Sequence, residues 1–279
     1  MKILRDLGAL RATVRSWRRA DRSVGLVPTM GALHEGHASL IRRAHGENDV
    51  VVVSIFVNPT QFGPREDFTR YPRPFHRDAA LCRREGAAAI FAPSADELYP
   101  AGFDTWVTSD KLSAPLCGAF RPGHFRGVAT VVLKLMNLVQ PARAYFGEKD
   151  FQQCRVIQKM VRDLDVPVQV VPCPTVREPS GLALSSRNAF LSPGDRAAAP
   201  LLRRALRVAG QVLKSRRNLS EARRAARDVV RKIPGAKIQY LDIVDPETLA
   251  PLSRAGGPAL VAAAVFVGPT RLIDNERVM

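Results

Sequence analysis

Hydrophobic positions in the first half of the chain alternate between short continuous apolar runs and longer stretches with helical spacing. The apolar runs are VGLVPT, DVVVVSIFVN, AAAIFAP, ARAYFGEK and VPVQVVPCP. Helical spacing precedes or separates them over residues 4–20, 37–45, 75–85, 126–141 and 151–164. Continuous apolar strands divided by helices indicate a parallel sheet that is covered on both faces. In such sheets, ligands bind beyond the carboxyl ends of the strands, near the point where the strand order reverses.

The pattern changes near Thr175. Ser192-Pro193-Gly194-Asp195 has the residues of a helix start, and Asn218 opens a further helix. After Pro234-Gly235, two strands are expected at AKIQYLDIVD and PALVAAAVFVG, and a short last strand at TRLID. Helices followed by strands favour an α+β arrangement. The prediction is therefore an α/β protein with a Rossmann-like domain over residues 1–175 and a smaller α+β domain over 176–279.

Composition indicates a soluble globular protein, with 46% hydrophobic and 24% charged residues. Residues 1–17 lack the pattern of a signal peptide, and the longest apolar runs are too short to span a bilayer. We therefore expect a cytoplasmic protein without membrane segments. The cysteines are too far apart for a zinc knuckle or a disulfide framework, so we expect them to be reduced and mostly buried: Cys82, Cys117, Cys154 and Cys173.

The formal net charge of +16 is compatible with nucleic acid or with anionic substrates as partners. Most of the positive charge is arginine, and much of it alternates with Ala and Leu in helical stretches such as residues 196–217. No basic stripe interleaved with aromatic residues is visible, as base stacking would require. The pattern favours a basic surface with an anion site over a nucleic-acid-binding protein.

The stretch VPTMGALHEGHASL, residues 27–40, carries two histidines directly after a predicted strand. A P-loop is excluded because Lys-Ser/Thr is missing after the second glycine. A zinc site needs a third ligand, and none stands nearby at a metal-like spacing. We expect His34 in the loop and His37 at the start of a helix, where imidazoles and free N–H groups bind phosphate oxygens. Two surface histidines remain the alternative, and Glu35 is expected to point away as a spacer.

Two further segments follow predicted strands. In VNPTQFGP, Asn58 and Gln61 would lie at the carboxyl edge of the sheet and fix a small hydroxylated ligand, unless the segment is an ordinary turn. In FGEKDFQQ, Gly147 permits close backbone approach, Lys149 places a positive charge at a strand end, and Asp150 can accept from ribose hydroxyls. Such a charged triplet is also common in plain loops.

Two loops carry less specific signals. Ser185, Ser186 and Arg187 of SSRN have hydroxyls and a guanidinium that suit phosphate oxygens, although the same letters occur in turns. Arg121 and His124 of RPGHFRGV either line a site or lie in a surface loop, and the sequence assigns neither a catalytic role.

These segments together resemble a known family. The motif H-x-G-H after a first strand resembles the motif that marks the nucleotidylyltransferase superfamily. The blocks VPTMGALHEGH, SIFVNPTQFGPREDFTRYPR, RPGHFRGVATVVLKL, YFGEKDFQQ, GLALSSRN and TRLIDN, in this order over residues 27–275, resemble the pantoate–beta-alanine ligases. The resemblance implies the substrates ATP, pantoate and β-alanine, Mg²⁺ used with ATP, no tightly bound organic cofactor, and a homodimer.

The resemblance also implies residue roles, with the first domain binding nucleotide and pantoate and the second acting as a lid over the β- and γ-phosphates. The catalytic set is His34, His37, Lys149, Ser185, Ser186 and Arg187. The ATP set adds Pro28, Thr29, Met30, Gly31, Gly36, Gly147, Glu148, Asp150, Val176 and Leu184. The pantoate set is Gln61, Gln153, Met30, Asn58 and Tyr71. Asp78 is implied as a metal position, directly or through water.

One position departs from the family pattern, because Ser180 precedes Gly181 where the family has an acidic residue. This departure puts a local carboxylate contact or turn in question. The expected chemistry is attack of a carboxylate on the α-phosphorus of ATP, followed by attack of an amine on the acyl adenylate with release of AMP. Another nucleotidylyltransferase, or an RNA-binding protein with this fold, remains an alternative.

Overall fold

The computed structural model describes residues 1–64 and 66–279. The chain divides into two compact units, which are described separately below. The first unit consists of Met1–Ser109, Arg121–Glu148 and Gln153–Pro174. The second unit consists of Asp110–Phe120, Lys149–Gln152 and Thr175–Met279. The second unit therefore takes in two short segments that lie within the first 175 residues of the sequence.

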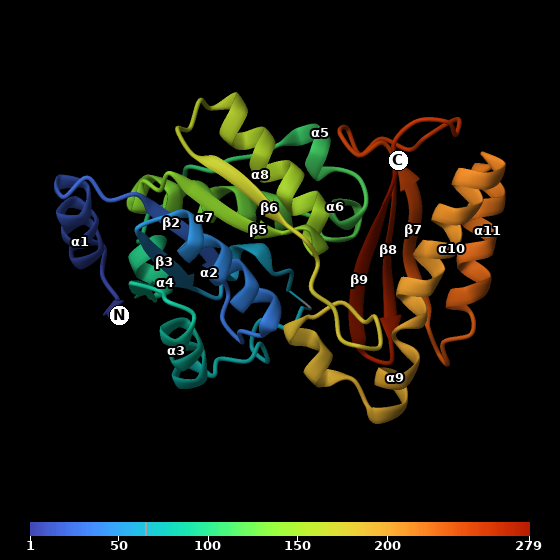
Figure 1. Cartoon of the computed structure of the whole chain (residues 1–279), viewed down its shortest axis with the longest axis horizontal. Coiled ribbons are helices and arrows are strands. Elements are labelled where there is room, and N and C mark those ends of the chain that lie inside the picture. The colour runs from blue at the N-terminus through green and yellow to red at the C-terminus, as the bar shows by residue number, and fades with distance from the viewer. Residues whose placement is uncertain (65) are drawn as a thin grey trace. The chain divides into compact units, whose positions relative to one another are not determined.

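The first unit is built on a six-stranded parallel sheet with strand order β1-β4-β3-β2-β5-β6 (Figure 1). Its strands are β1 (Lys2–Leu4), β2 (Val24–Thr29), β3 (Val50–Ile55), β4 (Ala89–Phe91), β5 (Arg143–Gly147) and β6 (Gln169–Cys173). The predicted parallel α/β sheet is confirmed. Only the edge strand β1 was missed, because its three residues are too few to show a pattern and two are exposed.

Helices bury both sides of the central strands. The helices are α1 (Leu7–Arg19), α2 (Glu35–Glu47), α3 (Phe75–Arg84), α4 (Ala95–Leu98), α7 (His124–Val139) and α8 (Phe151–Asp163). Ile41 of α2 and Cys82 of α3 share one core cluster with Val51 and Val53 of β3. The alternate strand residue Val52 is fully buried as well, so the sheet is covered on both faces, as the continuous apolar runs predicted.

The second unit contains a three-stranded antiparallel sheet with the order β7-β8-β9. Its strands are β7 (Lys237–Val244), β8 (Ala259–Val267) and β9 (Thr270–Val278), and its helices are α5 (Asp110–Ser113), α6 (Cys117–Phe120), α9 (Pro193–Ala198), α10 (Leu201–Arg216) and α11 (Leu219–Val230). Alternate β8 side chains share a core with the apolar faces of α10 and α11. The predicted α+β arrangement of this part is confirmed.

Two details of the second unit differ from the sequence prediction. The last strand was predicted to be short, but β9 has nine residues, because its polar end still alternates between buried and half-buried positions on an edge strand. The basic stretch 196–217 is not one helix: α9 ends at Ala198, and α10 begins after Pro200. The predicted caps Ser192 and Asn218 do accept from the backbone at the starts of α9 and α11.

The four cysteines are buried and none forms a disulfide bond, as predicted. In residues 1–64 and 66–279, no helix is long and apolar enough to cross a membrane.

Candidate active site

The strand order reverses at β2. The chain steps from β2 to β3 and β4 on one side, and β5 then pairs with the other side of β2. The HEGH segment leaves the carboxyl end of β2, and Gly147 ends β5 at the same edge of the sheet. Both segments therefore lie at the switch point, where parallel α/β sheets bind their ligands.

A tight turn connects β2 to α2. Gly31 and Ala32 both have positive φ angles, of 82° and 50°. A Cβ atom at Gly31 would lie 3.1 Å from Asp78 Oδ2 and 3.1 Å from a methyl carbon of Ile55, so the turn favours glycine sterically and conformationally. The Thr29 hydroxyl accepts from Gly31 N at 3.1 Å. These contacts fix the direction in which the chain enters α2.

The Asp78 carboxylate holds the same turn from α3. Its two oxygens accept from Ala32 N and Leu33 N, both at 2.8 Å, and the side chain is 1% exposed. Burial raises the pKa of Asp78, and the two backbone donors act in the opposite direction. Asp78 therefore shapes the turn. A metal contact by Asp78 stays a prediction. In the part of the chain that the structure describes, no group of three or more His, Cys, Asp or Glu side chains could hold a metal ion.

The two histidines form the start of α2 itself. His34 is the N-cap, and its Nδ1 accepts from Gly36 N at 3.1 Å. His37, the third residue of the helix, accepts from His34 N through Nδ1 at 3.3 Å. Because both Nδ1 atoms act as acceptors, each neutral ring carries its proton on Nε2. The ring centroids are 4.2 Å apart. The helix start therefore has two imidazole Nε2–H donors beside its positive dipole end.

The predicted placement of both histidines is confirmed, with His34 before the helix and His37 within its first turn. Glu35 is exposed and pairs with Arg42 of the same helix, so it acts as the predicted spacer and belongs to the helix surface.

Asn58 precedes and Gln61 ends the 3₁₀ turn η1 (Pro59–Gln61), which follows β3. Asn58 is 1% exposed, and its Nδ2 donates to Gly127 O at 3.1 Å and to Gln61 Oε1 at 3.2 Å. Its Oδ1 accepts from the backbone N–H and the hydroxyl of Thr60. Because Gly127 O can only accept, these contacts fix the orientation of the Asn58 amide. That orientation in turn directs Gln61 Nε2 toward Met30 Sδ, at 2.9 Å.

Asn58 thus has protein partners at both ends of its amide, and they give it the role of orienting Gln61. A direct contact between Asn58 and pantoate stays a prediction. Tyr71, also in the predicted pantoate set, is buried and packs edge-on against Phe62, with ring centroids 6.0 Å apart. Gln153 is the third residue of α8 and is half-buried.

Helix α7 approaches η1 so closely that Gly127 has no room for a side chain. A Cβ atom there would lie 2.5 Å from Thr60 O and 2.8 Å from Gln61 N, both backbone atoms. We expect Gly127→Ala to lower the free energy of unfolding by about 1–3 kcal/mol, the usual cost of overpacking. Denaturant unfolding measures this change. Gly46 of α2, which has nothing within 4 Å of its Cβ position, is the matched control. A Gly127→Ala variant as stable as Gly46→Ala would contradict the close packing.

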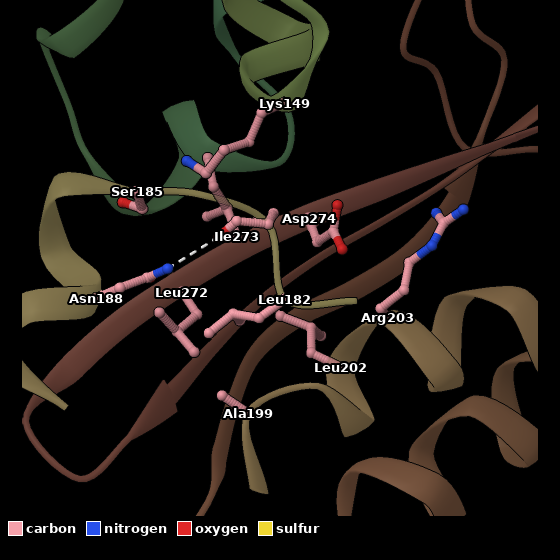
Figure 2. A pocket seen from close by; sticks show the side chains of 11 residues that line it. Lys149, Leu182, Ser185, Asn188, Ala199, Leu202, Arg203, Leu272, Ile273 and Asp274 are labelled. Atoms are coloured by element: carbon pink, nitrogen blue, oxygen red, sulfur yellow. Dashed lines mark hydrogen bonds between the residues drawn. The ribbon is translucent and has the colours of Figure 1, made fainter. Parts of the chain in front are cut away.

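In the second unit, Lys149 lies in a 3₁₀ turn, η2 (Glu148–Asp150), that directly follows β5 in the chain. Its carbonyl accepts from Asn275 Nδ2 at 3.0 Å, and its Nζ lies 3.9 Å from Asp150 Oδ1. Figure 2 shows Lys149 at a recess with Ser185 and side chains of β9 and α10. The recess is lined by Lys149, Leu182, Ala183, Ser185, Asn188, Ala199, Leu202, Arg203, Leu272, Ile273 and Asp274.

The SSRN segment follows a short hairpin that is fixed to β9. Leu184 N donates to Val176 O at 3.0 Å, and Arg177 pairs with both carboxylate oxygens of Asp274, at 2.7 and 2.9 Å. Ser185 then caps the 3₁₀ helix η3 (Ser186–Phe190) by accepting from Arg187 N at 3.2 Å. The structure therefore brings Lys149, Ser185 and the polar end of β9 together within the second unit.

Ser180, which stands where the family has an acidic residue, stabilises the turn at the tip of this hairpin. Its hydroxyl accepts from Leu182 N at 3.4 Å, and Gly181 has a φ angle of 92°. Gly181 N donates to Glu178 O at 2.8 Å. A serine hydroxyl can accept at a turn as a carboxylate does, although more weakly. The turn is therefore present without the acidic residue.

Several residues that hold these segments had no predicted role. Asp274 and Asn275 anchor the hairpin and Lys149, and Glu66 pairs with Arg121. A signal for Asp274 and Asn275 was present in the sequence, since these two adjacent polar residues directly follow the apolar pair Leu272-Ile273. Nothing near Glu66 in the sequence points to Arg121, because its partner stands 55 residues further along.

The parallel sheet, its switch point and the helix start with His34 and His37 define a parallel α/β protein with a candidate anion site at the carboxyl edge of its sheet. The model of the pantoate–beta-alanine ligase family matches residues 2–277. Pantothenate synthetase of Moorella thermoacetica is 53% identical over 276 residues, covering 99% of this chain and 98% of that protein. The Thermotoga neapolitana enzyme is 51% identical, with 99% of each chain covered. The chain belongs to the pantoate–beta-alanine ligase family and is a ligase.

Solved structures agree with this assignment. The crystal structure of pantothenate synthetase from Thermus thermophilus matches with a TM-score of 0.94 and 50% identity, covering 99% of both chains. The pantoate–beta-alanine ligase from Francisella tularensis, complexed with beta-gamma ATP and beta-alanine, matches with a TM-score of 0.82 and 36% identity. That match covers 99% of this chain and 97% of the Francisella chain.

Proposed function

We propose that this chain condenses pantoate with β-alanine in an ATP-dependent reaction that passes through pantoyl adenylate and releases pyrophosphate and AMP. The observation that carries the proposal is the start of α2, where His34 and His37 direct two Nε2–H donors from the switch point of the sheet. The oriented Gln61 amide, 2.9 Å from Met30 Sδ, supplies a polar group for a small hydroxy acid in the same unit.

In the first step, the pantoate carboxylate attacks the α-phosphorus of ATP and displaces pyrophosphate. Negative charge grows on the α-phosphate and on the departing oxygens, so catalysis relies on positioning and on fixed hydrogen-bond donors. His34, His37, Lys149, Ser185, Ser186 and Arg187 are the proposed donors. Gln61 and Gln153 hold pantoate, and Gly147 and Asp150 hold the nucleoside.

In the second step, the amine of β-alanine attacks the acyl carbon, and AMP leaves as a stable anion. Mg²⁺ bound with ATP would supply charge neutralisation at the triphosphate. Mg²⁺ commonly binds through substrate phosphates with few protein ligands. We further propose that the enzyme is a cytoplasmic homodimer, as the family resemblance implies, and that the second unit serves as the lid.

Omission of one substrate at a time tests the function. With ATP, Mg²⁺ and pantoate alone, we expect little free AMP, because the adenylate stays bound. Addition of β-alanine is expected to trigger stoichiometric release of AMP, which a coupled assay measures. Free nucleotide adduct as the final product, with no effect of β-alanine, would instead identify another nucleotidylyltransferase. Tight RNA binding at about 0.15 M salt without turnover would favour the RNA-binding alternative.

A further inference from the structure

We infer that Glu66, Arg121 and His124 form a positioning network that sets the orientation of Gln61 for pantoate. The inference rests on the proposed function, in which Gln61 binds pantoate. The backbone carbonyl oxygen of Gln61 accepts from His124 Nδ1 at 2.8 Å and from Arg121 Nη2 at 3.2 Å. Two side chains from the start of α7 and the loop before it thus converge on one backbone atom of η1.

The hydrogen bonds of His124 determine its protonation. The carbonyl of Gln61 can only accept, so Nδ1 of His124 must carry a proton. The guanidinium of Arg121 can only donate, and its Nη1 lies 3.1 Å from Nε2 of His124, so Nε2 must be an acceptor. His124 is therefore neutral with its proton on Nδ1. Because it is only 9% exposed, its ring is held in this orientation by the packing around it.

Glu66 fixes Arg121 in turn. Its carboxylate accepts from Arg121 Nε at 2.7 Å and from Nη2 at 2.5 Å, a bidentate geometry that orients the guanidinium plane. Burial raises the pKa of Glu66, but the hydrogen bond and charge of Arg121 outweigh it, so the pKa lies below its usual value. Glu66 is therefore ionised at neutral pH. The Arg121 side chain is 12% exposed, and the pair is screened little by water.

The network determines the position of a functional group and not only the stability of the fold. Turn η1 has three residues, so a rotation of the Gln61 backbone moves its side-chain amide directly. Asn58 donates to Oε1 of the Gln61 side chain, and the network donates to the backbone carbonyl oxygen of the same residue. Loss of the network is expected to weaken pantoate binding while ATP binding, at the start of α2, is retained. The RPGHFRGV segment, which the sequence left without a role, thereby gains one.

The test compares His124→Leu with His124→Asn. Leucine removes both ring nitrogens, whereas the Asn Nδ2 group can donate to Gln61 O from nearly the place of the histidine Nδ1. We expect the KM for pantoate to rise about 10-fold in His124→Leu, as for one lost hydrogen bond, with the KM for ATP unchanged. In His124→Asn, the KM for pantoate is expected to return most of the way to the wild-type value. Tyr145→Phe is the matched structural control, because it removes buried hydrogen bonds to Asn48 and Glu47 elsewhere in the first unit.

Tyr145→Phe is expected to lower the melting temperature without changing either KM. An unchanged pantoate KM in a folded His124→Leu variant would overturn the inference. Equal rises in the pantoate and ATP KM values would overturn it as well, because a general structural defect would explain them. A wild-type enzyme that releases no AMP with ATP, pantoate and β-alanine all present would refute the proposed function instead, so the two failures are distinguishable.

A double-mutant cycle provides an independent readout. If Arg121 and His124 act as one unit, the effect of Arg121→Met on the pantoate KM should be much smaller in the His124→Leu background than in the wild type. Additive effects of the two substitutions would contradict the network.

Discussion

Replacement of His34 by alanine is expected to lower kcat about 10²–10³-fold, the usual cost of losing one transition-state hydrogen-bond donor. The imidazole has one observed role and one proposed role. Its Nδ1 caps α2 by accepting from Gly36 N, and this contact leaves the proton on Nε2, the proposed donor to phosphate. Alanine removes both roles, so the loss of rate must be separated from the loss of the cap. Steady-state turnover and thermal unfolding should be measured together.

His34→Asn makes that separation. Asparagine is among the best N-cap residues, so this variant is expected to keep the stability that alanine loses, about 1 kcal/mol. Its short amide does not reach the position of Nε2, so kcat should stay low. His45→Ala, at the exposed end of the same helix, should behave like the wild type. Recovery of kcat in His34→Asn would show that His34 contributes only as a cap.

Lys149→Ala is expected to lower kcat by a similar factor of about 10²–10³. The backbone of Lys149 is fixed by Asn275, while its ammonium group, at a side-chain exposure of 18%, lies in the recess with Ser185. In the proposed reaction, a positive charge in this setting would stabilise the charge that develops as pyrophosphate leaves. Because this charge acts in the first step, ATP–pyrophosphate exchange dependent on pantoate should fall by the same factor as overall turnover.

Lys159→Ala controls for the removal of a lysine side chain. Lys159 pairs with Asp163 on the surface of α8, and exposed pairs of this kind contribute little. The Lys159→Ala variant is expected to show ATP–pyrophosphate exchange close to that of the wild type. If Lys149→Ala retains full pyrophosphate exchange but loses overall turnover, Lys149 acts in the amine step and the assignment to pyrophosphate departure is wrong.

Much of the first unit could be predicted from local patterns. The apolar runs at β2, β3, β4, β5 and β6 are recognisable because a buried parallel strand needs apolar residues on both faces. Strand β1 was missed and β9 was predicted too short, because edge strands tolerate polar residues and lose that signal. Cap residues such as Ser192 and Asn218 were predictable because they act on backbone groups two or three positions away.

The sequence by itself determined the parallel α/β sheet, the place of His34 and His37 at a helix start, and the place of Lys149 after a strand. Each of these follows from periodicity or from contacts within a few residues. Only the tertiary structure decided which atoms carry the protons and which residues hold the site. The contacts of Asp78 with the turn 46 residues earlier and the convergence of Arg121 and His124 on Gln61 are of this kind. Their physical reason is common: a hydrogen bond between distant residues depends on the direction in which each side chain enters the folded site, and no period in the sequence records that direction.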